Sequence, residues 1–316
     1  MPDGVIVEGE RWFPSPASFA EDMPDAWGDW GVDSEVGTLR AVLMRRPGPE
    51  IENIGAPGAF RFAGQMDPVK AQEQHDALVE IYREHGVRVY YVENMRPDRP
   101  NGVYVRDLVF MTPQGAILAR PGISARRGEE RYAAEALARL GVPIIHTVCG
   151  EGTFEGACAT WVDRETVIIG TSSRCNAAGA AQVEATLRAI GVKTIIPFQI
   201  PFGSIHIDGI LNIADRRKAM IFPWQTPYDV ARALLDKGFT LLENPHIEEI
   251  KIGHGLNFVA LEPGKVVMPA GNPLSRRVLE DGGIEVIEAD ISELMKGRGA
   301  IHCMTAFLKR DPIGTL

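Results

Sequence analysis

The reactive side chains of this 316-residue chain recur at a nearly constant spacing. Asp107 lies 48 residues before Glu155, and Glu155 lies 51 residues before His206. Cys303 follows His206 after 97 residues, about twice that spacing, and Asp208 stands close behind His206. A near-fixed spacing is typical of a repeated structural unit, in which equivalent positions lie around one axis. The spacing therefore predicts that all of these side chains converge on one cavity.

These residue types suit nucleophilic chemistry on a planar cation. A thiol attacks only as a thiolate, so Cys303 needs a lowered pKa or a nearby base. His206 can move protons near neutral pH, and a carboxylate such as Glu155 can fix its tautomer and raise its pKa. Asp107 and Asp208 can accept charge-assisted hydrogen bonds from a group with several N–H donors. A guanidinium held in this way would present its central carbon to the sulfur.

The same period appears in the elements that must position these side chains. Five glycines, spaced 55, 50, 47 and 45 residues apart, each follow a helical pattern and precede an apolar extended run: Gly86, Gly141, Gly191, Gly238 and Gly283. A glycine that follows a helix and precedes a strand is typical of a helix C-terminal cap. Each unit reads as strand, strand, helix, strand, with strands expected at 38–44, 103–111 and 207–215 and a helix beginning at Asp67-Pro68.

The repeat predicts an α/β fold, a five-unit pseudo-symmetric α/β propeller with its helices outside and a central active-site channel. A doubly wound α/β sheet is the alternative, which the extra hairpin in each unit disfavours. Residues 1–34 are predicted to form an N-terminal extension, and residues 35–316 a single catalytic domain. Trp12, Trp27 and Trp30 are expected to fix the extension to the body or to a second subunit.

The motifs VRD (105–107), FEG (154–156), HID (206–208) and GAIHCMT (299–305) resemble the sequence marks of the guanidino-group-modifying enzymes, the pentein superfamily. This superfamily contains arginine and agmatine deiminases, dimethylarginine dimethylaminohydrolases and amidinotransferases. The resemblance covers residues 35–316 and keeps the order of the motifs. It implies the five-unit propeller and a metal-independent cysteine enzyme without a cofactor.

The resemblance also implies a role for each residue. Cys303 would attack the amidine carbon and form a thiouronium-like covalent intermediate. His206 would protonate the leaving amine and then activate water, with Glu155 orienting the imidazole. Asp107 and Asp208 would bind the guanidinium nitrogens. Arg174 resembles a family arginine that often holds a substrate carboxylate; a structural role is the alternative for it.

Two segments depart from the family pattern. Many members have Glu-Gly-Gly-Asp, whereas this chain has Glu155-Gly156-Ala157-Cys158, which removes a negative charge. The Arg174 segment reads Arg-Cys-Asn where Arg-Thr-Asn is common. The first departure favours an unusual substrate, one that is smaller, less cationic or heterocyclic, such as a nitroimidazole. The second places another thiol nearby.

The composition of the chain excludes several classes of binding partner. The net charge of −9 argues against nucleic acid or an acidic membrane surface, and 45% apolar residues are typical of a globular protein. No apolar run approaches the ~20 residues of a membrane span, and the start of the chain lacks the pattern of a secretory signal. The four cysteines show no zinc-ligand spacing and indicate reduced thiols in the cytoplasm. We expect a small guanidino or amidino substrate. The tryptophan-rich extension suggests an interface between subunits of a homo-oligomer.

Three functions remain open at this point. The first is a hydrolase that cleaves a C–N bond at a guanidine or amidine carbon through Cys303. The second is an amidinotransferase, which would pass the same covalent intermediate to an amine. The third is a catalytically silent propeller that only binds a ligand. The sequence around Cys303, His-Cys-Met-Thr, favours the hydrolase.

Overall fold

Five small sheets, each of three strands, make up the strand content of the described chain. The computed structural model describes residues 14–52 and 54–313. The sheets have the orders β15-β1-β2, β3-β4-β5, β6-β7-β8, β9-β10-β11 and β12-β13-β14. The strand bounds are β1 Leu39–Met44, β2 Arg88–Tyr91, β3 Val109–Thr112, β4 Gly115–Leu118, β5 Ile144–Thr147, β6 Ala159–Asp163, β7 Thr166–Thr171, β8 Thr194–Gln199, β9 Leu211–Asp215, β10 Lys218–Ile221, β11 Thr240–Glu243, β12 Val259–Glu262, β13 Lys265–Pro269, β14 Glu285–Ala289 and β15 Ala306–Arg310.

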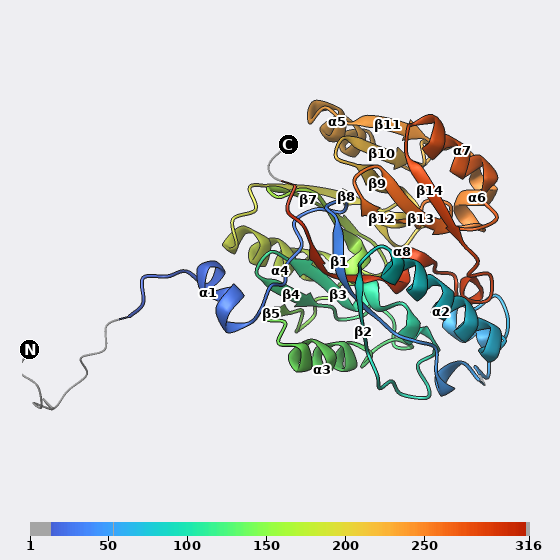
Figure 1. The fold of residues 1–316 in the computed structure, drawn as a ribbon, viewed down its shortest axis with the longest axis horizontal. Helices are drawn as coiled ribbons and strands as arrows, with labels where there is room; N and C mark the ends of the chain where they lie inside the picture. The colour runs from blue at the N-terminus through green and yellow to red at the C-terminus, as the bar shows by residue number, and fades with distance from the viewer. Residues whose placement is uncertain (1–13, 53, 314–316) are drawn as a thin grey trace, which may run out of the picture.

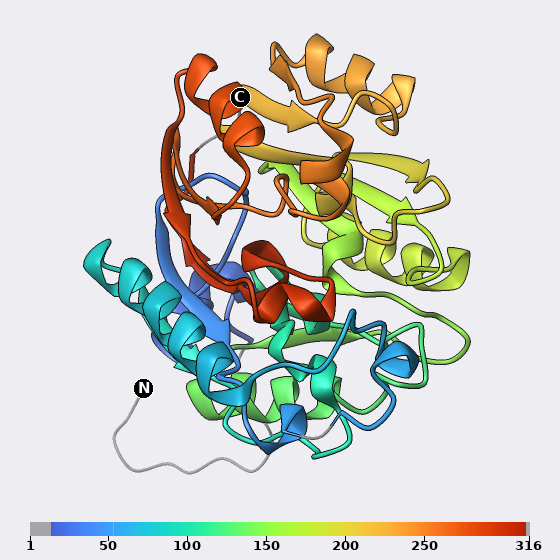
Figure 2. The ribbon, with the colours of Figure 1, turned by 90° about the vertical axis from the view of Figure 1, so that its right-hand side faces the viewer.

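Helices connect the strands of each sheet and lie toward the outside of the molecule (Figures 1 and 2). Only α8, which precedes β15, lies among the sheets near the centre. The α-helices are α1 Phe19–Ala26, α2 Pro68–Glu84, α3 Glu130–Leu140, α4 Ala177–Ala189, α5 Tyr228–Asp236, α6 Ile247–Lys251, α7 Pro273–Asp281 and α8 Ile301–Met304. Short 3₁₀ helices are η1 Pro49–Ile51, η2 Pro57–Phe60, η3 Pro100–Val103, η4 Val105–Leu108, η5 Gly156–Cys158, η6 Ile207–Gly209 and η7 Leu294–Gly297.

All five sheets share one hydrogen-bonding pattern. The middle strand pairs antiparallel with one neighbour and parallel with the other, and a helix makes the crossover to the parallel neighbour. Four units follow the predicted order strand, strand, helix, strand. In the first sheet the antiparallel strand, β15, comes from the other end of the chain. Within the described residues, this arrangement of separate sheets differs from a single doubly wound sheet.

The five predicted glycines all adopt the left-handed backbone conformation. Their φ angles are 74° at Gly86, 76° at Gly141, 98° at Gly191, 78° at Gly238 and 73° at Gly283. L-residues with a side chain rarely adopt this region, so glycine is needed where the helix stops and the chain turns into the next strand. The structure thus confirms the repeat and gives its physical cause.

The prediction of strands over 103–111 and 207–215 was partly wrong. Only β3 and β9 at the ends of these segments are strands, and the residues before them form η4 and η6. Every residue of η4 is buried, including the charged pair Arg106 and Asp107. An unbroken buried run reads as a strand in the sequence because periodicity alone cannot separate it from a tightly packed turn.

The buried apolar side chains form two clusters. One lies mainly among the sheets of β1–β8 and around α8, and the other mainly among the sheets of β9–β14. No helix in the described part of the chain is long and apolar enough to cross a membrane.

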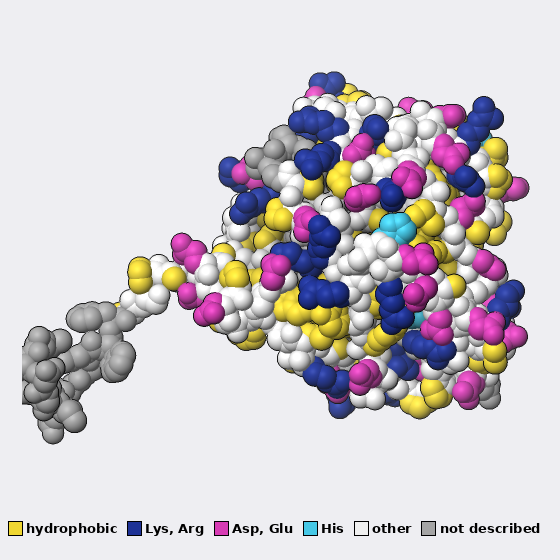
Figure 3. Space-filling view, viewed as in Figure 1, with side chains coloured by type: hydrophobic (Ala, Val, Ile, Leu, Met, Phe, Trp, Pro, Cys, Tyr) yellow, Lys and Arg dark blue, Asp and Glu magenta, His cyan; other side chains and the backbone are white. Residues whose placement is uncertain are grey.

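The described part of the extension leaves the body through α1 (Figures 1 and 3). Ser18 and Glu21 form a capping box at the start of this helix. Trp27 is exposed, whereas Trp30 packs edge-on against Tyr90 at 5.8 Å. Trp12 lies outside the described residues. Residues 31–36 are buried in the body, so the projecting part ends near Trp30.

We predict that Phe307→Ala destabilises the protein by about 3–5 kcal/mol, the usual cost of deleting a large buried ring. Phe307 is buried on β15, pairs with Val42 of β1, and packs against the guanidinium groups of Arg310 at 4.1 Å and Arg106 at 4.9 Å. Urea denaturation measures the change, with the fully exposed Phe202→Ala as control. Equal free energies of unfolding for the two variants would contradict the inferred contribution of Phe307 packing to stability.

Candidate active site

Five of the six predicted site residues lie on or beside short helical turns that precede the antiparallel edge strands, whereas Arg174 lies between β7 and α4. Asp107 lies in η4 before β3, Glu155 directly before η5 and β6, and Asp208 in η6 before β9. His206 is the residue before η6, and Cys303 lies in α8 before β15. These turns pack against one another, η4 with η5 and α8, and η5 with η6. The structure therefore brings the predicted side chains together from four units.

Close contact between η4 and η5 requires a glycine. A Cβ at Gly156 would lie 2.3 Å from the carbonyl oxygen of Arg106 and 2.6 Å from that of Val109. Both distances are far below van der Waals contact, and neither atom belongs to a movable side chain. The Gly in the Glu155-Gly156 motif thus allows Glu155 to approach the unit that carries Asp107.

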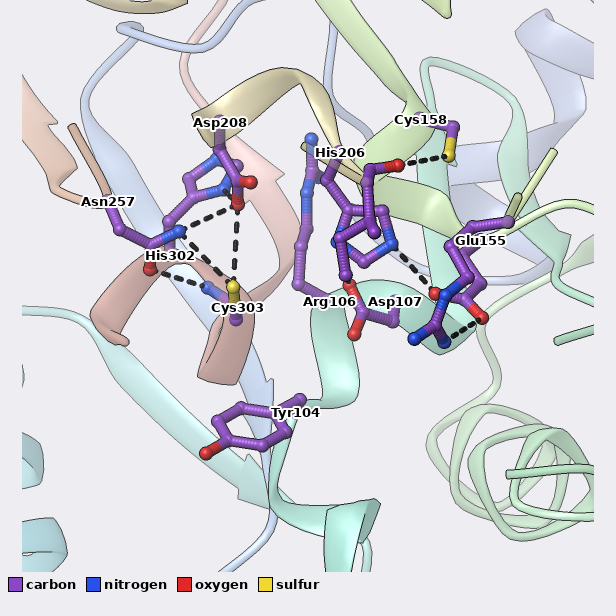
Figure 4. A network of polar contacts seen from close by, with 12 residues as sticks. Tyr104, Arg106, Asp107, Glu155, Cys158, His206, Asp208, Asn257, His302 and Cys303 are labelled. Atoms are coloured by element: carbon purple, nitrogen blue, oxygen red, sulfur yellow. Dashed lines mark hydrogen bonds and ion pairs between the residues drawn. The ribbon is translucent and has the colours of Figure 1, made fainter. Parts of the chain in front are cut away.

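The thiol of Cys303 belongs to a compact polar group (Figure 4). Its Sγ lies 3.2 Å from Asn257 Nδ2 and 3.5 Å from Asp208 Oδ2. Asn257 Nδ2 also donates to Asp208 Oδ2 at 2.9 Å, and its Oδ1 accepts from the backbone N–H of Cys303 at 3.2 Å. His302 Nδ1 contacts the same Asp208 oxygen at 2.9 Å. These contacts hold the thiol beside the Asp208 carboxylate rather than beside the imidazole of His206.

His206 and Glu155 form a second group across the site (Figure 4). His206 Nε2 lies 2.7 Å from Glu155 Oε2, and its Nδ1 lies 3.5 Å from Asp107 Oδ1. Arg174 Nη1 donates to Glu155 Oε1 at 3.1 Å, and Arg126 forms an ion pair with Asp107. Within the described residues, His206 and Cys303 share no hydrogen bond.

Two cavities meet at the thiol. The larger, about 430 Å³, is lined by Asp208, Asn257, His206 and Cys303 among others, and the smaller, about 30 Å³, by Asp107, Arg174, His206 and Cys303 among others. Glu155 is fully buried behind His206 and lines neither cavity. Five of the six predicted residues therefore face the site, and the sixth supports one of them.

Comparison with known proteins shows which family has this sequence and fold. The family model for N,N-dimethylarginine dimethylhydrolase, eukaryotic, matches residues 63–310. The chain belongs to this family. Its named relatives include dimethylarginine dimethylaminohydrolases and arginine deiminases, which hydrolyse C–N bonds. The resemblance to the guanidino-group-modifying superfamily is thereby confirmed.

Individual relatives are distant but cover most of the chain. The dimethylarginine dimethylaminohydrolase of Streptomyces coelicolor is 27% identical over 85% of this chain and 97% of its own. The 2-nitroimidazole nitrohydrolase of a Mycobacterium species is 24% identical over 80% of this chain and 72% of its own. A solved structure of the Pseudomonas aeruginosa dimethylarginine dimethylaminohydrolase, a cysteine-to-serine variant complexed with citrulline, matches with a TM-score of 0.72 and 25% identity. That match covers 85% of this chain and 99% of the other.

The departure from the family pattern at Ala157-Cys158 lies beneath the site. Cys158 is buried, and its Sγ lies 3.8 Å from the carbonyl oxygen of Ile205 and 4.0 Å from Ser172 Oγ. Neither Ala157 nor Cys158 lines either cavity. Cys158 therefore contacts the loop that carries His206, and neither residue forms a wall for a ligand.

The thiol of Cys303 is neutral in this environment. Burial raises its pKa well above the ordinary value, and the charges of Asp208 and Asp107 raise it further. Burial also raises the pKa of Asp208, but the hydrogen bond and charge of His302 outweigh it and lower that pKa to about 2. The sulfur therefore faces a carboxylate that stays charged, which opposes thiolate formation in the free protein.

His206 has the opposite shift. Burial lowers its pKa, but the charge of Asp107 and the hydrogen bond and charge of Glu155 outweigh this and raise it above the ordinary value. Burial raises the pKa of Glu155, and the hydrogen bond and charge of His206 bring it down to about 2. The pair is an ionised carboxylate beside an imidazole that readily carries a proton.

Sequence reasoning missed three buried residues of the network: Asn257, His302 and Glu35. A usable signal existed for Asn257, which lies 49 residues after Asp208 and 46 before Cys303. It is the fifth unit's contribution, two residues before β12, where the repeat spacing places one more polar residue. His302 stands next to Cys303 and contacts Glu35 Oε2 at 3.4 Å, a link that no spacing rule predicts.

One group of possible metal ligands lies in the described chain. Asp107, Glu155 and His206 each offer a ligand atom, all within 4.8 Å of one another. The facing atoms of Glu155 and His206 are already bonded to each other, and Asp107 is paired with Arg126. The expectation that the site works without a metal stays a prediction.

We predict that Glu155→Gln lowers the pKa of His206. The substitution keeps the size of the side chain but removes the negative charge that stabilises the imidazolium, while burial continues to disfavour it. An NMR titration of His206 should show its protonation moving to lower pH than in the wild type. Glu184→Gln, which breaks only an exposed ion pair with Arg188, is the control. An unchanged His206 titration would contradict the inferred coupling.

Proposed function

We propose that the protein hydrolyses a C–N bond at a guanidine-type carbon through a covalent intermediate on Cys303. The observation that carries this is the placement of two carboxylates at the cavities that share the thiol. Asp208 lies 3.5 Å from the sulfur, and Asp107 lines the smaller cavity. The buried Oδ1 of Asp107 has no hydrogen-bond partner among the described residues. A planar cation with several N–H donors would satisfy this oxygen.

The substrate itself would ionise the nucleophile. The carboxylates of Asp208 and Asp107 raise the pKa of the Cys303 thiol in the free protein. A guanidinium bound between them would neutralise their charges and place a positive charge near the sulfur. Both effects favour the thiolate, so the thiol would lose its proton to solvent on binding. The nucleophile would then form only when a cation of the right shape is present.

His206 would carry the proton transfers that follow. The thiolate adds to the guanidine carbon and forms a C–S bond. Protonated His206 donates its proton to the departing nitrogen as the C–N bond breaks, which leaves a thiouronium on Cys303. Neutral His206 then takes a proton from water, the hydroxide adds to the same carbon, and the C–S bond breaks to release the urea product. Glu155 holds the imidazole orientation throughout.

A dimethylarginine-like guanidine is the first substrate to test, because dimethylarginine dimethylaminohydrolases are among the named relatives. A 2-substituted nitroimidazole is the second, because one relative is a 2-nitroimidazole nitrohydrolase. The site offers the same chemistry to both, since each has a carbon bonded to two nitrogens and a leaving group. Arg174, expected from the sequence to hold a substrate carboxylate, contacts Glu155, and that role stays a prediction.

We also propose that the five sheets close into a five-unit propeller. Two contacts support this: β1 packs against β12, and β15 packs against β3. The first sheet thus lies between the last and the second along the chain, as closure requires. The pairing of β15 with β1 would then be the joint of the ring.

We predict that Cys303→Ser abolishes turnover of a dimethylated guanidine while the fold is kept. A serine hydroxyl is a far weaker nucleophile than a thiolate at neutral pH, and a loss of at least about 10³-fold in kcat/KM is expected. Cys149→Ser, at the exposed cysteine, is the matched control and should retain activity. Mass spectrometry of rapidly acidified wild-type protein should detect the covalent adduct at Cys303. An active serine variant would contradict the proposed mechanism.

Two product measurements separate the alternatives. Formation of a urea in water alone supports a hydrolase, whereas product that appears only with an added amine supports an amidinotransferase. Release of nitrite from 2-nitroimidazole supports the heterocyclic substrate. Absence of any adduct with all three compounds would favour a silent ligand-binding protein.

A further inference from the structure

The two cavities beside Cys303 differ in size, and Arg61 and Arg298 line both of them. The larger, about 430 Å³, is lined by four basic side chains besides His206: Arg61, Lys251, His254 and Arg298. Its only carboxylate is Asp208. The Oδ2 of that carboxylate is already in contact with Asn257, His302 and Cys303. A ligand in this cavity therefore meets an excess of positive charge.

Arg61 and Arg298 have no direct partner of opposite charge within the described residues, although the charges of Glu155 and Asp107 act to raise the pKa of Arg61. Within the described residues, neither guanidinium has an ion pair or a side-chain hydrogen bond. Burial lowers the pKa of Arg61, and the charges of Arg174 and Arg298 lower it further, so these cations lie close enough to repel one another. The other two arginines near the site are engaged, Arg126 with Asp107 and Arg174 with Glu155. Of these four arginines, only Arg61 and Arg298, which line both cavities, have no ion pair within the described residues and can bind an anion.

The backbone holds these basic residues in an unfavourable conformation. Arg61, His254 and Arg298, with φ angles of 64°, 54° and 61°, are the only non-glycine residues with positive φ in the described chain. All three line the larger cavity. A side chain in this region is strained, because its Cβ lies too close to the following carbonyl oxygen. Such conformations persist where the surrounding structure needs them, and they gather at ligand-binding sites.

We propose that the larger cavity binds a carboxylate on the substrate through Arg61 and Arg298, and that the substrate lacks a free α-ammonium group. This proposal rests on the proposed function, since it places the reacting guanidinium between Asp107 and Asp208. Guanidinium groups bind carboxylates with paired, charge-assisted hydrogen bonds. A free ammonium in the same cavity would face Arg61, Arg298 and Lys251, and the one carboxylate there, Asp208, would already bind the guanidinium. The substrate class is thus an ω-guanidino acid rather than an α-amino acid.

Three guanidines with the carbon skeleton of arginine test this. 5-Guanidinopentanoate has the carboxylate alone, arginine has both charged groups, and agmatine has the ammonium alone. Binding to the Cys303→Ser protein is measured by calorimetry, so that the result does not depend on turnover. We expect 5-guanidinopentanoate to bind at least tenfold more tightly than arginine, and arginine more tightly than agmatine. Agmatine binding as tightly as 5-guanidinopentanoate would overturn the proposal.

Substitutions at the two arginines give a second readout. Asparagine removes the charge and tolerates positive φ better than most residues, so Arg61→Asn and Arg298→Asn add no backbone strain. Each should weaken 5-guanidinopentanoate binding about tenfold or more and leave agmatine binding unchanged or improved. The control is Arg83→Asn, at an exposed arginine of α2 that lies at neither cavity. Unchanged 5-guanidinopentanoate binding in both variants would overturn the proposal and leave Arg174 as the carboxylate ligand.

These experiments distinguish failure of the anion-site proposal from failure of the proposed hydrolase function. If the charge preference holds in binding but wild-type protein forms no adduct with any guanidine, the anion site stands and the hydrolase proposal fails. If adducts form equally with all three compounds and their affinities are equal, the hydrolase stands and the anion site fails.

Discussion

Glu35 is ionised where solvent does not reach it, and the groups that compensate its charge come from several units of the fold. Its Oε1 accepts from Arg106 Nη2 at 3.0 Å and from the backbone N–H of Trp161 at 3.3 Å. Its Oε2 lies 3.4 Å from His302 Nε2. Burial raises the pKa of Glu35, but the charge of Arg106 and the hydrogen bond of His302 outweigh it and lower the pKa to about 2. Removing one partner of such a buried pair typically costs about 3–5 kcal/mol.

This buried charge also sets the geometry of the candidate nucleophile. His302 joins Glu35 on one side to Asp208 on the other, and Asp208 lies beside the sulfur of Cys303. The carboxylate near the thiol is thus held from the interior of the protein and not by the ligand. A site fixed in this way needs little rearrangement when a cation enters, which is the usual condition for strong electrostatic stabilisation.

Much of the site could be predicted because the repeat fixes register. The glycines at the helix ends are required by backbone sterics, so they mark the units in the sequence, and polar residues at matching points were expected to converge. The same register extends to Asn257, although an asparagine gives no chemical signal by itself. Glu35 and His302 could not be predicted, because their partners lie in other units and depend on packing. Periodicity likewise could not separate the buried 3₁₀ turn around Asp107 from a strand.

The sheet of β1 and β2 receives its third strand from β15, whose neighbour α8 carries Cys303. Contacts across this sheet span up to 271 residues, as between Arg40 and Asp311. Pairing over such separations is slow, and strands made early must wait for a partner made late. During synthesis the carboxylates Asp107 and Asp208 leave the ribosome well before the sulfur. A growing chain therefore contains the proposed cation-binding carboxylates before the proposed nucleophile, and the proposed site is complete only once the last strand has been made.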